Sequence, residues 1–196
     1  MFRFAAFRGA ILAAAVAMFT GNGAFAEELK IGDAAPAFAV TGIDGQEYSL
    51  EDLSKDVDVV VVCFTCSGCP VAQAYEERLI EFNKKYQDKK VAFVAVNSNN
   101  ATEDLEGMKS RAKDKGYNFL YAFDSSGKAA ENYGAKVTPE FFIIHKGKVA
   151  YHGAFDDKQK EPTESYVANA VDALLSGSAP KVAETKAFGC GIKKAK

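Results

Sequence analysis

The sequence has little of several features that would point to a specialised class of protein. Its 196 residues include four cysteines, two histidines, five prolines and no tryptophan, and the formal net charge is -2. So few cysteines exclude a disulfide scaffold, and the lack of excess positive charge argues against nucleic-acid binding. The one prominent apolar run is ten residues long, which is too short to span a bilayer. The remaining composition is that of an ordinary globular protein.

That apolar run lies near the N-terminus and has the features of an export signal. Arg3 and Arg8 precede it, the run covers residues 10–19, and Ala24-Phe25-Ala26 has the form of a signal-peptidase site. We therefore expect residues 1–26 to be a cleavable signal peptide, which would place the mature chain in the periplasm or another extracytoplasmic compartment. Disulfides form and persist in such compartments. We expect no membrane contact after cleavage.

The rest of the chain alternates strand and helix signals in the manner of an α/β domain. Two β-branched apolar runs, residues 57–64 and 91–96, lack alternation, which is typical of strands buried on both faces. Residues 70–86 carry apolar side chains at spacings of three and four, which predicts an amphipathic helix. The full order, β-α-β-α-β-(α)-β-β-α, predicts a mixed central sheet flanked by helices. We assign residues 27–177 to this domain and residues 178–196 to a C-terminal tail.

Turn and capping signals refine this outline. Asp44-Gly45 between two short apolar segments predicts a hairpin at the N-terminal end of the domain. Asn100 and Glu103 have the spacing of an N-terminal cap, for a helix that ends before Gly116. Lys146-Gly147 predicts the turn of a second hairpin near the C-terminal end of the domain.

Three of the four cysteines lie within seven residues, at Cys63, Cys66 and Cys69. Cys66-Ser67-Gly68-Cys69 follows a predicted strand and opens a predicted helix, because Pro70 suits a first helical turn. Backbone N–H groups and the helix dipole stabilise a thiolate at such a place and lower its pKa. A second thiol after a two-residue spacer can resolve a mixed disulfide. The pattern therefore predicts a redox-active pair, Cys66 and Cys69.

Two other interpretations of the cysteine cluster remain open. The pair could form a static structural disulfide, although so short a loop removes little chain entropy. Cys63, Cys66 and Cys69 could instead hold Cu(I) or Zn(II) as soft ligands. Cys63 lies inside the predicted strand, however, so we expect it to be a buried apolar side chain, and we expect His145 and His152 on the second hairpin. On this basis we expect neither a metal nor another cofactor.

Two features outside the cluster have roles that the residues alone leave undecided. Thr138-Pro139 precedes a predicted strand, which is where a proline belongs because it cannot donate to a ladder. Cys190 lies in the tail between Gly189 and Gly191. It is either an additional redox thiol that exchanges with Cys66 or a free thiol on a loose tail.

These residues together resemble the thioredoxin-like superfamily, on the side of the redoxins, the alkyl-hydroperoxide-reductase and thiol-specific-antioxidant family. The likeness covers residues 29–176. Residues 31–38 have the family's opening Gly-Asp-x-x-Pro-x-Phe, Cys66-x-x-Cys69 stands at its active-site position, and Val137-Thr138-Pro139 stands at that of its cis-proline. The ending around Cys190 looks like a peroxiredoxin-like subgroup. The resemblance implies a thioredoxin-like fold with an N-terminal β-hairpin extension.

The resemblance also implies roles for individual residues. Cys66 would be the attacking thiol, as the more exposed of the pair, and Cys69 the resolving thiol. Thr138 and Pro139 would shape the substrate site, with a cis bond between them, and Cys190 would be a possible additional redox thiol. The partners would be disulfide-bearing or dithiol proteins, together with a thiol–disulfide protein that recycles the pair.

Departures from the family pattern decide between the activities that it allows. Peroxiredoxins place a threonine three residues before the peroxidatic cysteine and add a distant arginine. Here Cys66 stands three residues before Cys69, and the arginines after residue 26 are Arg78 and Arg111 alone. The missing tryptophan and the Ser67-Gly68 spacer also depart from thioredoxins proper. We therefore expect an exported thiol–disulfide oxidoreductase, with a thiol peroxidase or a copper-binding or copper-delivery protein of the same fold as alternatives.

Overall fold

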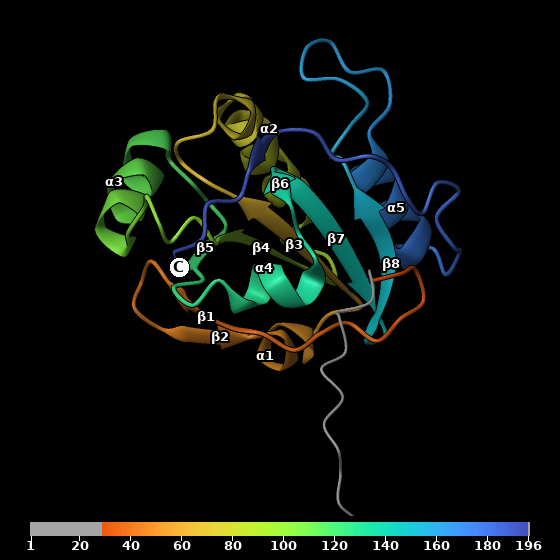
Figure 1. The fold of residues 1–196 in the computed structure, drawn as a ribbon. Coiled ribbons are helices and arrows are strands. Elements are labelled where there is room, and N and C mark those ends of the chain that lie inside the picture. The colour runs from red at the N-terminus through yellow and green to blue at the C-terminus, as the bar shows by residue number, and fades with distance from the viewer. Residues whose placement is uncertain (1–28, 196) are drawn as a thin grey trace, which may run out of the picture.

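A computed structural model describes residues 29–195, which are organised around a seven-stranded sheet (Figure 1). The strands follow one another across the sheet in the order β2 (Glu47–Ser49), β1 (Ala39–Gly42), β5 (Leu120–Phe123), β4 (Val91–Asn97), β3 (Val59–Thr65), β7 (Glu140–His145) and β8 (Lys148–Gly153). The three central strands β5, β4 and β3 are parallel, whereas β1 and β7 run antiparallel to their central neighbours. The sheet is therefore mixed, as predicted. The predicted signal peptide, residues 1–26, lies outside the described residues.

Helices cover both faces of this sheet (Figure 1). In the described part of the chain they are α1 (Leu50–Ser54), α2 (Pro70–Tyr86), α3 (Leu105–Lys115), α4 (Lys128–Tyr133) and α5 (Tyr166–Leu175). Side chains of β3 alternate between two cores, with Val61 and Cys63 in the core under α2, α3 and α5, and Val62 and Phe64 in the core under α1 and α4. Every residue of β3 is buried, which explains its unbroken apolar sequence. Between residues 29 and 195, no helix combines the length and apolarity needed to cross a membrane.

Most predicted elements are confirmed, and one predicted cap is wrong. The helix α2 covers the predicted residues 70–86, and the N-terminal hairpin forms from β1 and β2, extending the sheet beside β5. The helix α3 is not capped by Asn100 and Glu103. Its N-cap is Asp104, whose carboxylate accepts a hydrogen bond of 2.8 Å from the N–H of Gly107. This leaves the longer side chain of Glu103 free to reach another part of the chain.

The segment after α5 lies against the domain instead of hanging loose (Figure 1, blue). It first runs beside β8, where the N–H of Thr185 donates to the carbonyl of His152 at 3.0 Å. Farther on, β9 (Cys190–Gly191) pairs antiparallel with β6 (Val137–Thr138) in a separate two-stranded sheet. The tail predicted for residues 178–196 is therefore part of the fold wherever the structure describes it, and it packs Cys190 against Cys66 and Cys69.

Candidate redox site

Cys66 and Cys69 lie at the junction where β3 ends and α2 begins. Cys66 follows the last residue of β3, and Cys69 is the N-cap of α2, with its sulfur 3.5 Å from the N–H of Ala72, which donates to it. Pro70 occupies the first turn, where its missing N–H costs no helical hydrogen bond. The side chains of Cys66 and Cys69 are both buried, at 4% and 1% exposure. The predicted strand, cysteine pair and helix are thus confirmed as one local unit.

The predicted site residues meet at Thr138. Its hydroxyl oxygen is 3.2 Å from the sulfur of Cys66, and its carbonyl oxygen accepts a hydrogen bond of 3.3 Å from the sulfur of Cys69. The same hydroxyl donates to the carbonyl of Cys190 at 3.4 Å. The Thr138–Pro139 bond is cis, as the resemblance implied. One threonine therefore contacts both cysteines of the pair and a third that is distant from them in the sequence.

The remaining cysteine, Cys63, belongs to the apolar core. It is fully buried between β4 and β7, among the side chains under α2. Burial, followed by the neighbouring Cys66, raises the pKa of its thiol well above the usual value. All four cysteines are unbonded thiols in this structure. Cys63 is thus a buried apolar residue, as predicted, and a poor nucleophile.

The two thiols of the pair differ in acidity, and only Cys69 has the lowered pKa expected of a thiol at a helix N-terminus. Burial raises the pKa of Cys66, and the nearby carboxylate of Glu103 adds to this, while the hydrogen bond with Thr138 opposes it. Burial also disfavours the Cys69 thiolate, but contacts from the Cys190 thiol, the N–H of Ala72 and Thr138 outweigh it, so the pKa of Cys69 is lowered. The N–H groups of the first helical turn therefore act mainly on Cys69, which caps the helix.

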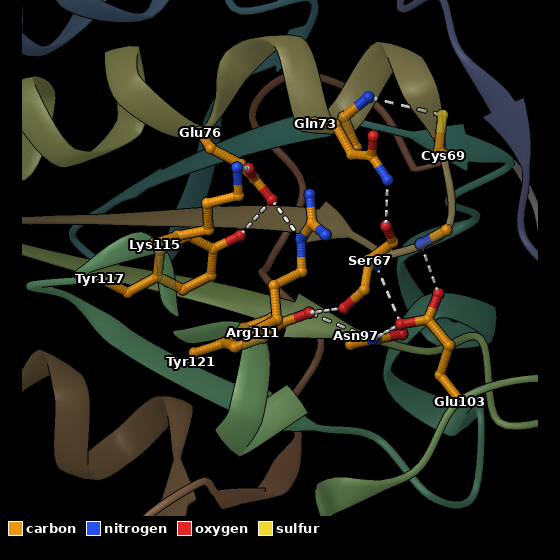
Figure 2. Close-up of polar contacts among 12 residues, drawn as sticks. Ser67, Cys69, Gln73, Glu76, Asn97, Glu103, Arg111, Lys115, Tyr117 and Tyr121 are labelled. Carbon is orange, nitrogen blue, oxygen red and sulfur yellow. Dashed lines mark hydrogen bonds and ion pairs between the residues drawn. The ribbon is translucent and has the colours of Figure 1, made fainter. Parts of the chain in front are cut away.

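Glu103 holds the turn between the two cysteines (Figure 2). Its carboxylate accepts hydrogen bonds from the backbone N–H groups of Ser67 and Gly68, both at 2.9 Å, and from the side-chain amide of Asn97 at 2.6 Å. On the other side of the turn, the Gln73 amide donates to the carbonyl of Ser67 at 2.7 Å. The spacer of the cysteine pair is thus fixed through its main chain.

Sequence reasoning assigned Glu103 to a helix cap and missed this role. Glu103 lies in the loop after β4, and the cysteine pair follows β3, the parallel strand beside it. The carboxyl ends of adjacent parallel strands meet at one edge of a sheet, where functional groups gather. A carboxylate shortly after the neighbouring strand was therefore a usable signal.

Both arginines of the described chain are engaged by carboxylates. Arg78 on α2 forms an ion pair with the buried Asp156, and Arg111 on α3 binds Glu76 at 2.5 Å. Figure 2 shows the second pair, together with Tyr117, whose hydroxyl donates to the same Glu76 oxygen at 2.6 Å. Neither arginine is available to stabilise a leaving peroxide oxygen without giving up its partner, so the geometry does not favour the peroxidase alternative.

The described residues offer little to a metal ion. Residues 29–195 contain no group of three or more His, Cys, Asp or Glu side chains placed to hold one. His145 ends β7, where its Nδ1 is 2.9 Å from the carbonyl of Asp58, and His152 on β8 contacts the carboxylate of Glu140 at 2.6 Å. The histidines thus lie on the second hairpin, and the copper alternative gains no support.

Comparisons with known proteins agree with this geometry. The family model described as AhpC/TSA matches residues 31–152. The thiol-disulfide oxidoreductase ResA of Bacillus thuringiensis (strain Al Hakam) is 30% identical over 160 residues, covering 80% of this chain and 89% of the relative. The chain is therefore homologous to thiol–disulfide oxidoreductases.

Solved structures give the same result. An uncharacterized conserved protein from Geobacillus kaustophilus matches with a TM-score of 0.79 and 33% identity, covering 85% of this chain and 93% of that one. A structure from Chlorobium tepidum, named as a thiol:disulfide interchange protein of the DsbE type, matches with a TM-score of 0.57 and 29% identity, covering 64% of this chain and 85% of that one. The thioredoxin-like fold is therefore confirmed.

Proposed function

Because the chain belongs to the AhpC/TSA family, we propose that it is a redox enzyme of the thiol–disulfide oxidoreductase kind, which is exported and exchanges disulfides through Cys66 and Cys69. The observation that carries this proposal is the meeting of both thiols at Thr138, at 3.2 and 3.3 Å, on the strand–helix junction. Homology to ResA supports the same chemistry. Export rests on the signal-like residues 1–26, and places the enzyme in the periplasm or another extracytoplasmic compartment.

In the reducing direction, Cys66 attacks a disulfide of a partner protein. A bond forms between the Cys66 sulfur and one partner sulfur, and the other partner sulfur leaves as a thiolate. Cys69, whose lowered pKa favours its thiolate, then attacks the Cys66 sulfur, closes the Cys66–Cys69 disulfide and releases the partner as a dithiol. A recycling thiol protein restores the pair.

In the oxidising direction, the order of acidity selects the sulfur that is attacked. Thiol–disulfide exchange is faster when the departing thiol has the lower pKa. A partner thiolate that attacks Cys66 expels Cys69, the thiol with the lowered pKa, whereas attack at Cys69 would expel Cys66, whose pKa is raised. The acidity of the pair therefore favours a mixed disulfide at Cys66 when a partner thiolate attacks the oxidised pair.

The experiment that tests the proposal is a redox titration. The protein is equilibrated in glutathione buffers of graded potential, its thiols are trapped by alkylation, and the pairs are mapped by mass spectrometry. We expect a reversible Cys66–Cys69 disulfide with a potential between about -120 and -270 mV, the span of exchange catalysts. A potential below about -300 mV, as structural disulfides have, contradicts the proposal.

Variants complete this test. Cys66→Ser should abolish disulfide exchange with a protein substrate, because the attacking sulfur is removed. Cys63→Ala is the matched control, since Cys63 is fully buried in the core, and it should retain exchange. Exchange that survives in Cys66→Ser would overturn the assignment of the attacking thiol.

A further inference from the structure

Backbone pairing brings a third thiol, that of Cys190, to the redox pair. In the two-stranded sheet of β6 and β9, Cys190 lies directly opposite Thr138. Its side chain packs against the small cluster formed by Cys66, Cys69 and Ala72. Since Thr138 contacts all three cysteines, their positions are set by the same residue.

The approach of β9 to this residue is unusually close and depends on Gly189. A Cβ atom on Gly189 would lie 1.9 Å from the carbonyl oxygen of Thr138, so no larger residue fits without displacing the strand. Two residues on, a Cβ on Gly191 would meet its nearest neighbour, the carbonyl of Lys136, at 4.0 Å. Past the strand, the N–H of Lys193 donates to the side chain of Asn99 at 2.9 Å. The strand is thus fitted to Thr138 and anchored beyond it.

The three thiols differ in access to other proteins. Cys66 and Cys69 are 4% and 1% exposed, whereas Cys190 is partly exposed at the end of the cluster. Of the three thiols, that of Cys190 is therefore the most accessible to another protein. This arrangement suits a thiol that passes a disulfide between the buried pair and the surface.

We propose that Cys190 forms a second disulfide with Cys69 and carries the oxidised state of the pair to the protein surface. The thiolate of Cys190 attacks the sulfur of Cys69 in the Cys66–Cys69 disulfide. A Cys69–Cys190 bond forms, the Cys66–Cys69 bond breaks, and its electron pair leaves on Cys66, which takes up a proton. The contact of Cys190 with Cys69 selects this sulfur, and not the acidity of the leaving thiol. The step is an exchange with no net oxidation, so it needs no further oxidant.

The electrostatics at Cys190 favour this step once the Cys66–Cys69 disulfide has formed. In the reduced protein, contact with Cys69, followed by burial, raises the pKa of Cys190, while Lys193 opposes the rise. Once Cys69 is bonded to Cys66 it carries no thiolate, so the largest cause of the raised pKa is removed. The Cys190 thiolate is therefore easier to form when the pair is oxidised than when it is reduced.

Recycling then takes place at the surface, and this part of the inference rests on the proposed function. A thiolate of the recycling dithiol protein attacks the sulfur of Cys190 and expels Cys69, the thiol with the lowered pKa. The second thiol of the partner resolves the mixed disulfide, which leaves the partner oxidised and all three cysteines reduced.

The pairing is tested in a Cys66→Ser variant, which keeps Cys69 and Cys190 but cannot form the first disulfide. The protein is equilibrated with reduced and oxidised glutathione, quenched in acid, alkylated and mapped by mass spectrometry. We expect the Cys69–Cys190 disulfide to exceed glutathione adducts of Cys69 by about tenfold or more, because a thiol held in place outcompetes a free one. Adducts in place of the disulfide would overturn the proposal.

Two glycine variants in the Cys66→Ser background test the positioning without changing a thiol. Gly189→Ala should reduce the Cys69–Cys190 disulfide about tenfold, because the added Cβ displaces β9 from Thr138. Gly191→Ala is the matched control on the same strand and should leave the yield unchanged. Equal yields in the two variants would contradict the role assigned to the strand.

The relay is tested by reducing the oxidised native chain with a dithiol protein, reduced thioredoxin. Cys190→Ser should slow this reduction about tenfold, and adding Val182→Cys, which restores a thiol on an exposed part of the same tail, should not restore the rate. An unchanged rate in Cys190→Ser overturns the relay and leaves the proposed function standing. Failure of the native chain to form Cys66–Cys69 overturns the proposed function, while the Cys69–Cys190 yield in Cys66→Ser still decides the pairing.

Discussion

The β3–α2 junction and the terminal segment 178–195 both bring cysteines to Thr138, but they depend on different forces. At the junction, a buried strand and a capped helix fix Cys66 and Cys69 within four residues of chain. In the terminal segment, Cys190 reaches the same place through contacts with β8 and β6 that are distant in sequence. We therefore expect that changes which detach the terminal segment leave the β3–α2 junction intact.

The largest effect on the free energy of unfolding is expected at the end of β8, where the terminal segment first contacts the domain. A Cβ on Gly153 would lie 2.2 Å from the hydroxyl and 2.4 Å from the carbonyl oxygen of Thr185, and its φ is +145°. Gly153→Ala should therefore lower the free energy of unfolding by about 3 kcal/mol through clash and strain, measured by urea unfolding. The Cys66–Cys69 disulfide should still form, because the junction does not depend on this contact.

A substitution at a second glycine measures the cost of backbone strain without the clash against Thr185. Gly147, in the turn between β7 and β8, has a φ of +74°, but a Cβ there would meet no atom of residues 29–195 within 4 Å beyond its chain neighbours. Gly147→Ala should cost about 1 kcal/mol, the strain of the left-handed conformation alone. Equal costs at the two glycines would mean that docking against Thr185 contributes no stability.

A smaller effect is expected at the junction itself. Glu103→Ala removes the acceptor of the N–H groups of Ser67 and Gly68, and we expect a loss of about 2 kcal/mol in the free energy of unfolding. Because the carboxylate raises the pKa of Cys66, the variant should also alkylate at Cys66 at lower pH. Urea unfolding and the pH dependence of alkylation measure the two effects.

Glu106→Ala provides the control for this change. Glu106 is an exposed carboxylate on α3 that pairs with Lys109 at 2.8 Å. Its loss should cost less than about 0.5 kcal/mol and leave the alkylation profile of Cys66 unchanged. A Glu103→Ala variant that behaves like Glu106→Ala would show that the spacer is rigid without its carboxylate.

The smallest effect on the free energy of unfolding is expected at Glu140. This residue supports β6, whose Thr138 contacts the cysteines of both regions. Its carboxylate accepts hydrogen bonds from the N–H groups of Lys136 and Val137, at 2.7 and 3.1 Å. Burial opposes the charged form, but these bonds and His152 lower the pKa of Glu140 below its ordinary value of 4.5. Glu140→Gln should cost about 1 kcal/mol at pH 7.

The sign of the pH dependence follows from this lowered pKa. The stabilisation from Glu140 is fully present above pH 4.5, its ordinary value, and is lost as the pH falls through the lower pKa of the folded state. The difference in urea stability between the native chain and Glu140→Gln should therefore shrink as the pH falls below this value. A difference that stays constant with pH would contradict the role of the charge.

Much of the fold could be predicted because its signals are local. The unbroken apolar run of β3 and the apolar spacing of α2 each lie within one element. The place of Cys63 in the core followed from its position inside that strand. Fold class, hairpins and the cysteine pair were therefore available from the sequence.

The unpredicted parts of the site depend on contacts between distant residues. Glu103 binds the N–H of Ser67 across 36 positions, and Thr138 contacts Cys190 across 52. The lowered pKa expected of a thiol at the helix N-terminus is that of Cys69, whereas the raised pKa of Cys66 depends on burial and on Glu103, neither of which the motif itself records. Spacing identifies the thiols, and three-dimensional contacts decide how they ionise.

The hydrogen bonds from the spacer, residues 67 and 68, to Glu103 limit which sequences this site tolerates. The carboxylate recognises main-chain N–H groups at positions 67 and 68, so a proline at either position would remove a donor. Most other residues at position 67 keep the N–H, whereas a Cβ at position 68 would meet a Glu103 oxygen at 3.3 Å. Libraries that vary the spacer to tune the redox potential should therefore randomise position 67 freely, keep position 68 small, and omit proline from both.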